Sequence, residues 1–201
     1  MIFNDEDDEK KKSAQKPEAL AEKFLKTRQI LLSGEINKEL AQSVNKQLLL
    51  LDSDGTKPIY IYIDSPGGDV SAGFAIFDMI RFVNAPVFLI GNGLIASAAA
   101  LVLLAVPKER RVGLPHSSYL IHQPLSEMRG VATDLQIQAE EMAKTRALLN
   151  KIIAEQTGKD EKQVKKDTER DYWLTAEEAK EYGLISKVIC GRKELAGIKI
   201  K

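Results

Sequence analysis

Only two histidines occur in the 201 residues, so any general base of the imidazole type has to be His116 or His122. His122 follows the apolar run 119–121, and Pro124 comes two residues later. A strand that ends here would place the imidazole at the rim of a sheet, where functional sites are often built. The same pattern also suits a histidine that only satisfies a nearby carbonyl group, so this feature alone leaves both interpretations open.

Ser97 stands among alanines, after a Gly-Asn-Gly turn at residues 91–93. A serine at the start of a helix lies near free amides and the positive end of the helix dipole, which favour developing negative charge. Its small neighbours would let a substrate backbone come close. The alternative is a serine that only caps the helix, and such caps are very common.

A third feature is the sharp Ser-Pro-Gly-Gly turn at residues 65–68. Such a turn can present free backbone N–H groups to the oxyanion of an acyl-transfer intermediate, and one such donor is worth about 3 kcal/mol. Most Gly-Gly turns are simply turns, so the motif is weak on its own.

The order of these candidates excludes several familiar enzymes. A serine followed by a histidine and then an acid is not the order of α/β-hydrolases, chymotrypsin or subtilisin. Ala96 and Ala98 flank Ser97, so the Gly-x-Ser-x-Gly elbow is absent. No Gly-x-x-x-x-Gly-Lys loop occurs, so the chain itself should not hydrolyse ATP. Pattern alone cannot select the acid among 29 carboxylates.

The elements that must position these residues alternate along the chain. Apolar runs predict strands at residues 28–32, 59–63, 86–90, 111–113, 119–122 and 184–189. Capping residues and helical spacing predict helices that begin after Asn37, near Val70, near Ser97, at Thr133 or Asp134, and at Thr175. Gly158 and Gly183 should close the last two helices, and strand 86–90 should end at the turn 91–93. Repeated strand-helix units of this size predict an α/β layered domain.

Composition narrows the class further. The 44% hydrophobic content suits one globular domain with a tail. Lys plus Arg equals Asp plus Glu, so neither nucleic acid nor an anionic membrane is expected as the main partner. Cys190 is the single cysteine, which excludes an internal disulfide and favours a reducing compartment, most simply the cytoplasm. The long apolar stretch 86–106 is broken by residues 91–93, so we expect buried elements and no membrane span.

The ends of the chain differ from its middle. Residues 1–18 are mostly charged, acidic first and then basic, which is the wrong order for a signal peptide. We expect a mobile tail there, with a solvated first helical turn as the alternative. The folded domain is expected at residues 19–193, followed by a short C-terminal tail at 194–201.

Seven blocks, in this order, resemble the Clp protease proteolytic subunit family of serine peptidases. They are residues 60–68 (YIYIDSPGG), 73–78 (GFAIFD), 93–97 (GLIAS), 121–124 (IHQP), 132–134 (ATD), 167–171 (DTERD) and 176–184 (AEEAKEYGL). Each block is weak alone, but together they cover roughly residues 25 to 190 at the spacing of the family. The order and spacing make the resemblance specific.

The resemblance implies a role for each matching position. Ser97 matches the nucleophile, His122 the general base, and Asp171 the acid that orients the imidazole. The backbone N–H groups of Gly68 and Ala98 match the oxyanion hole. No cofactor or metal is implied for the chain itself, because ATP is used by a partner.

The resemblance also implies a fold and an assembly. The fold is a crotonase-like α/β spiral of β-α units with a protruding handle helix from about Thr133 to Gln156. Two heptameric rings stack into a chamber of 14 subunits, and an AAA+ Clp ATPase feeds in unfolded polypeptides. The residues matched to these contacts are Tyr60, Tyr62 and Phe82 for ATPase docking, and Asp134 and Arg170 for the contact between rings.

Two departures from the family pattern keep alternatives open. Ser97-Ala98-Ala99 stands where the family usually has Ser-Met-Gly, which changes a wall of the specificity pocket, and the charged N-terminus does not match the family's axial segment. One alternative is a ring subunit that is competent only beside an active paralogous subunit. Another is a crotonase-fold enzyme acting on acyl-CoA, against which the block 167–171 argues. Tyr60, Tyr62 and Phe82 could also be ordinary core residues.

Overall fold

The computed structural model of the chain describes residues 22–197, and within them seven strands form one sheet. The strands are β1 (Gln29–Ser33), β2 (Ile59–Ser65), β3 (Val87–Ala96), β4 (Arg111–Gly113), β5 (Ser118–Ile121), β6 (Tyr172–Thr175) and β7 (Lys187–Val188). The order is β1-β2-β3-β4-β7, while β5 also pairs with β3 and β6 pairs with β5. Only the β5–β6 pair is antiparallel among the described strands.

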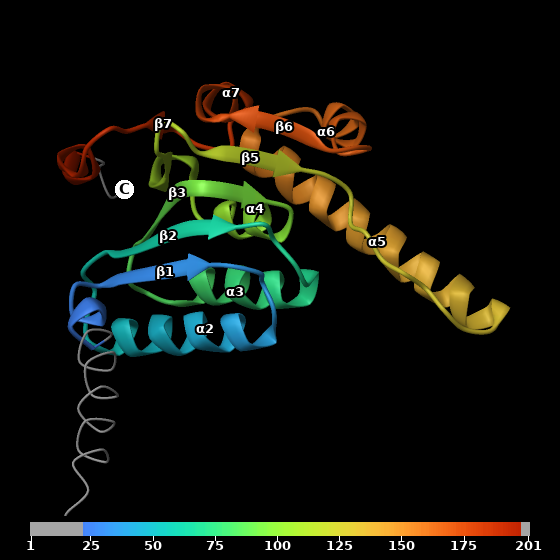
Figure 1. Cartoon of the computed structure of the whole chain (residues 1–201), viewed down its shortest axis with the longest axis horizontal. Coiled ribbons are helices and arrows are strands. Elements are labelled where there is room, and N and C mark those ends of the chain that lie inside the picture. The colour runs from blue at the N-terminus through green and yellow to red at the C-terminus, as the bar shows by residue number, and fades with distance from the viewer. Residues whose placement is uncertain (1–21, 198–201) are drawn as a thin grey trace, which may run out of the picture.

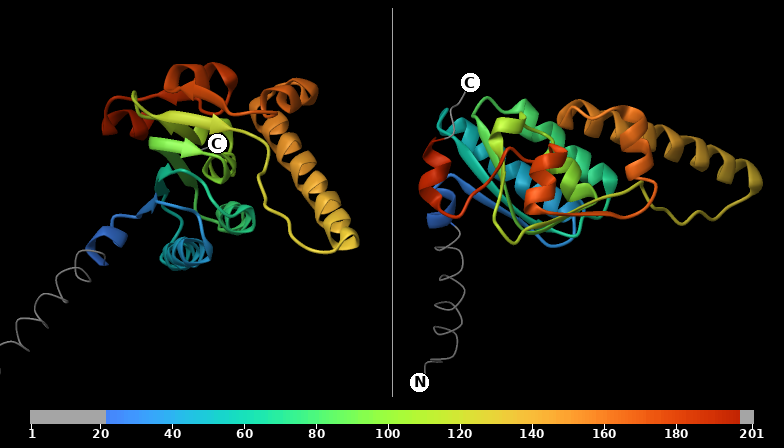
Figure 2. Two further views of the ribbon diagram at one scale, coloured as in Figure 1. Left: turned by 45° about the vertical axis from the view of Figure 1, so that its right-hand side comes forward. Right: turned by 90° about the horizontal axis from the view of Figure 1, so that it is seen from above.

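The helices surround this sheet and connect its strands. They are α2 (Lys38–Ser53), α3 (Val70–Phe82), α4 (Ala98–Leu103), α5 (Ala132–Thr157), α6 (Glu161–Asp167) and α7 (Ala176–Tyr182), with 3-10 turns η1 (Lys108–Arg110) and η2 (Arg192–Gly197). Figure 1 shows α2, α3 and α4 along one face of the sheet. The views in Figure 2 show α5 projecting away from the rest of the molecule. The predicted α/β spiral with a protruding helix is confirmed.

Alternation along β2 explains how the sheet is covered on both faces. Ile59, Ile61 and Ile63 are fully buried in the main core. Tyr60 and Tyr62 point to the opposite face, where they pack on a second, smaller apolar cluster. The two faces of the central strands are therefore both apolar, as expected for a parallel sheet.

The strand that leads to Ser97 is longer than the sequence predicted. β3 does not end at the Gly-Asn-Gly segment but continues to Ala96. The Asp64 carboxylate accepts a hydrogen bond from Leu94 N at 3.0 Å, and β2 pairs with β3 again at Ser65 and Ile95 after a register shift. The glycines therefore form an irregularity within one strand, where the prediction placed a turn between two elements.

The longest helix, α5, also starts differently from the prediction. Val131 occupies the N-cap position, so neither Thr133 nor Asp134 caps the helix. Gly158 ends it in a left-handed conformation (φ 75°), as predicted. The residues of α5 that are buried all lie in its C-terminal half, namely Asn150, Ile153 and Ala154. The N-terminal half of α5 therefore protrudes without burying a side chain in the described part of the chain.

The C-terminal third holds two elements that the sequence did not reveal. Helix α6 buries one residue, Val164, and strand β6 buries only Leu174, so neither has a clear hydrophobic period. The last predicted strand, 184–189, is reduced to the two residues of β7. In the predicted tail, Leu195 lies in η2 and packs on the second cluster. The predicted N-terminal tail, residues 1–18, and residues 198–201 lie outside the described residues.

Candidate active site

Ser97 lies at a strained turn between β3 and α4. Its backbone has φ 57° and ψ −121°, a region that residues with a side chain rarely adopt. Ser97 N donates to Leu120 O at 2.9 Å, which ties the turn to the neighbouring strand β5. The Ser97 hydroxyl makes no capping hydrogen bond to α4. The hydroxyl is therefore not used as a structural cap.

Sheet pairing places Ser97 beside His122. β5 runs parallel to β3, with Leu120 opposite Ala96. Ser97, which follows β3, and His122, which follows β5, therefore lie at the same edge of the sheet. His122 Nε2 lies 2.8 Å from Ser97 Oγ, a hydrogen-bonding distance. This is the contact that a base needs in order to take the serine proton.

The second ring nitrogen of His122 faces Asp171. β6 runs antiparallel to β5, with Tyr172 opposite Ile121, so the residue before β6 lies next to the residue after β5. His122 Nδ1 is 3.3 Å from Asp171 Oδ1. The imidazole side chain is 13% exposed, whereas the Asp171 side chain is 62% exposed. With Nδ1–H donating to the carboxylate, Nε2 is free to accept the proton from Ser97.

The glycine turn lies directly against the serine. Ile36 N donates to Gly67 O at 2.7 Å, and Asp69 N donates to Ile36 O at 2.8 Å. In such a bridge the N–H of the intervening residue, Gly68, points away from Ile36. A Cβ on Gly67 would lie only 2.7 Å from Ser97 Cβ and 2.9 Å from the backbone nitrogen of the next residue. Both glycines have positive φ, so the close approach depends on their lack of a side chain.

The two predicted oxyanion donors thus come from adjacent backbone segments. Gly68 belongs to the turn just described, and Ala98 is the first residue of α4, where the N–H has no helical partner. The sequence predicted the turn 65–68, which includes Gly67, and the family resemblance selected Gly68, but Ile36, which holds the turn against Ser97, was missed. The Gly-Gly pair hinted at a close approach, but nothing in the sequence pointed to Ile36.

A small apolar cavity opens beside Ser97. Apart from Ser97 and His122, the residues that line it are all apolar: Val70, Ala98, Ala100, Leu101, Ile121, Pro124, Leu149 and Ile153. A cavity of this kind suits an apolar side chain of a substrate. The sequence predicted the helix that carries Leu149 and Ile153 but did not show that they face the serine.

The structure brings two of the three predicted docking residues together. Tyr60 and Tyr62 line one pocket with Arg192 and Leu195. Phe82, the last residue of α3, is 76% exposed and is not among the residues that line this pocket. Both tyrosines are partly exposed and also pack on the second apolar cluster.

The predicted ring-contact residues lie far apart within one chain. Asp134 is in the first turn of α5. Arg170 adjoins Glu169, whose carboxylate binds Arg146 on the same helix at 2.7 Å. Twelve residues of helix separate Asp134 from Arg146, which is about 18 Å. Any contact that joins Asp134 to Arg170 would need a second chain.

Among the described residues no group of three or more His, Cys, Asp or Glu side chains could hold a metal ion.

Comparison with known proteins decides the family. A family model described as Clp protease matches residues 11–192. The chain belongs to the Clp protease family. The ATP-dependent Clp protease proteolytic subunit 2 of Treponema denticola is 61% identical over 195 residues, covering 96% of this chain and 98% of the relative. The corresponding subunit 3 of Rhizobium etli is 45% identical and covers 96% of this chain and 100% of the relative.

The solved structures agree with this assignment. A ClpP1 mutant from Listeria monocytogenes superposes with a TM-score of 0.82 at 45% identity, covering 88% of this chain and 99% of that one. As a member of the Clp protease family the chain is a serine peptidase, and the acyl-CoA alternative loses its basis. No helix between residues 22 and 197 is long and apolar enough to cross a membrane.

Proposed function

We propose that the chain is a serine endopeptidase in which Ser97 is the nucleophile, His122 the general base and Asp171 the acid that orients the imidazole. The observation that carries this proposal is the pair of contacts through the two ring nitrogens of His122, 2.8 Å to Ser97 Oγ and 3.3 Å to Asp171 Oδ1. The hydroxyl, the imidazole and the carboxylate come from three different elements, and no structural role explains their alignment.

In the proposed reaction, Ser97 Oγ attacks the carbonyl carbon of a peptide bond while its proton passes to His122 Nε2. Asp171 accepts a hydrogen bond from Nδ1–H and stabilises the imidazolium that forms. The tetrahedral intermediate collapses when Nε2 gives the proton to the leaving amine. A water molecule, deprotonated by the same nitrogen, then hydrolyses the acyl-enzyme and releases Ser97.

The backbone N–H groups of Gly68 and Ala98 are proposed to bind the oxyanion. Support comes from the close packing of the glycine turn on Ser97 and from the absence of an α4 partner for Ala98 N. A donor in such a position contributes about 3 to 4 kcal/mol to the stability of the transition state. The apolar cavity beside Ser97 would receive the side chain next to the scissile bond.

We further propose that the chain assembles as two stacked heptamers and receives unfolded polypeptides from an AAA+ Clp ATPase. The unburied N-terminal half of α5 supports a contact with another chain, and Asp134 and Arg170 would meet across it. The pocket of Tyr60 and Tyr62, together with the exposed Phe82 of a neighbouring subunit, would receive ATPase segments. The relatives are described as ATP-dependent, and the ATP would be bound by the partner. We place the assembly in the cytoplasm, consistent with a single free cysteine.

The test combines activity with assembly. The purified chain and its Ser97→Ala variant are each incubated with an unfolded protein that carries a fluorescent label, with and without a Clp ATPase and ATP. We expect degradation by the parent only, from a particle with the mass of fourteen subunits. A fourteen-subunit particle that degrades nothing, even with the ATPase, would support the alternative subunit that needs an active paralogue. Equal degradation by Ser97→Ala would contradict the proposed nucleophile.

A further inference from the structure

Of the three side chains in the proposed site, that of Asp171 is held by the weakest contacts with the rest of the protein. Its side chain is 62% exposed, and its 3.3 Å contact with His122 lies at the long limit of an N–H···O hydrogen bond. Among the described residues, His122 is the only partner of this carboxylate. The position of Asp171 is therefore set by the backbone on both sides of it, by β6, which follows it and pairs with β5, and by residues 168–170, which precede it.

Thr168 fixes that backbone from within the protein. It is fully buried at the end of α6, and its hydroxyl lies 2.9 Å from both Asn150 Oδ1 and Val164 O. Asn150, on α5, is itself only 4% exposed. The hydroxyl has a single proton for these two acceptors, and its contact with Val164 is local, within the end of α6. The bond to Asn150 is different in kind, because it joins the segment before Asp171 to the base of the handle helix.

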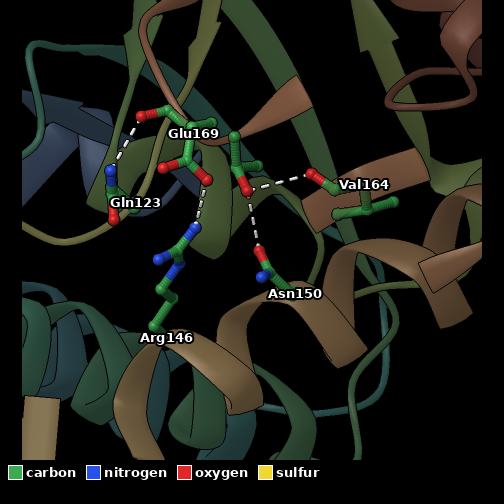
Figure 3. A network of polar contacts seen from close by, with 6 residues as sticks. Gln123, Arg146, Asn150, Val164 and Glu169 are labelled. Carbon is green, nitrogen blue, oxygen red and sulfur yellow. Dashed lines mark hydrogen bonds and ion pairs between the residues drawn. The ribbon is translucent and has the colours of Figure 1, made fainter. Parts of the chain in front are cut away.

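The same segment is also joined to the residue that follows the imidazole. Gln123 N donates to Thr168 O, and Gln123 Nε2 donates to Glu169 O, both at 2.7 Å. Figure 3 shows Gln123 and Arg146 both reaching Glu169. The supports of His122 and Asp171 therefore meet at Thr168 and Glu169, three and two residues before the acid.

We propose that Thr168 and Asn150 are positioning residues that hold Asp171 in line with His122 through their buried side-chain hydrogen bond. Neither residue touches the reacting atoms. The inference rests on the proposed function of Ser97, His122 and Asp171 and adds to it the element that aligns the acid, the buried half of α5. Arg146, which is partly buried, and Glu169, which is exposed, form a second, outer tie of the same segment.

The test is a kinetic cycle on the assembled enzyme with a fluorogenic peptide. Thr168→Val keeps the shape of the side chain and removes its hydroxyl, while Thr168→Ser keeps the hydroxyl. We expect Thr168→Val to lower kcat on the order of tenfold with KM nearly unchanged, the size of effect typical of a lost buried hydrogen bond. Thr168→Ser should restore most of the loss.

A matched control separates positioning from general stability. Thr157 Oγ1 also donates to a carbonyl four residues back, Ile153 O at 2.6 Å, at the end of α5 but without a bond to the segment before Asp171. Thr157→Val should therefore leave kcat within about twofold of the parent, and the melting temperature of both valine variants is measured beside their kcat. An equal loss of kcat in both variants would overturn the proposal.

The decisive arm places Thr168→Val in the Asp171→Asn background. If Thr168 acts through Asp171, it should have almost no further effect once the carboxylate is gone, since residues that act as a unit are not additive. A full tenfold loss in that background would overturn the proposal. If Thr168→Val does not assemble, Asn150→Ala is predicted to show the same pattern. An unimpaired Asp171→Asn enzyme would instead contradict the proposed function itself.

Discussion

The serine side and the aspartate side of the proposed site are built differently. Ser97 is followed by residues that are almost fully buried, and Gly67 packs directly against it from a turn held by Ile36. Asp171 is largely exposed and is held through Thr168 by a helix whose other half buries nothing in the described chain. The proposed nucleophile is thus placed by the core, whereas the proposed acid is placed by the β5–β6 pair and, in our inference, by α5 through Thr168. Anything that moves α5 should act on the acid first.

The largest effect is expected on the serine side. Ser97→Ala and His122→Ala should each lower kcat on the order of a million-fold, because each removes the group on which the same proton transfer depends. The double variant should be no slower than either single variant. Peptide hydrolysis under saturating substrate measures all three. A double variant that is slower by orders of magnitude would show that the two residues act independently.

Loss of the acid should cost less. Asp171→Asn is expected to lower kcat by roughly a thousand-fold to ten-thousand-fold, since the imidazole loses its orienting carboxylate while the oxyanion donors remain. The mass of the assembly should be unchanged. A loss as large as that of Ser97→Ala, with intact assembly, would remove the difference between the two sides.

Crowding the serine turn should give an intermediate effect. In Gly67→Ala the new Cβ would lie 2.7 Å from Ser97 Cβ, so the turn must move and misplace the oxyanion donors. We expect kcat to fall on the order of a hundred-fold or more. Gly34→Ala is the control, because Gly34 has a similar φ of 87° with open space around its Cα. Similar losses of kcat in both variants would mean that backbone strain, and not contact with Ser97, is responsible.

The smallest effect concerns α7, which follows the strand next to Asp171. Thr175 and Glu178 form a capping box, and the hydrogen bonds from Thr175 N and Oγ1 lower the pKa of Glu178 below its usual 4.5. This group stabilises the fold above its unfolded pKa, and that stabilisation is lost as the pH falls through the lower folded value. Glu178→Gln should therefore lower the melting temperature at pH 7 and lower it by less at pH 3. An equal difference at both pH values would contradict the charge effect.

The sequence predicted the helices and strands best where one apolar face repeats regularly. The helix after Asn37, with buried Val44 and Leu48 at helical spacing, is an example. The prediction from sequence failed at α6 and β6, because each of them buries a single residue and so shows no repeating apolar face. It also failed at β3, because the Asp64 carboxylate that carries the strand past its glycines comes from another strand.

For the site, residue types and local pattern gave His122, which is one of only two histidines, and Ser97, whose preceding turn and small neighbours suit a nucleophile. They could not give Asp171, which is one carboxylate among many and became a candidate only through the family resemblance. The bond between Asn150 and Thr168 was beyond reach, because it joins two polar residues 18 positions apart whose burial is a property of the tertiary fold.

Labelling with a fluorophosphonate, followed by mass spectrometry of the labelled peptide, tests the central claim most directly. The reagent bonds only to an activated serine oxygen. The account predicts one modified residue, Ser97, with labelling abolished in His122→Ala and slowed in Asp171→Asn. Modification of a different serine, or unchanged labelling of Ser97 in His122→Ala, would contradict it.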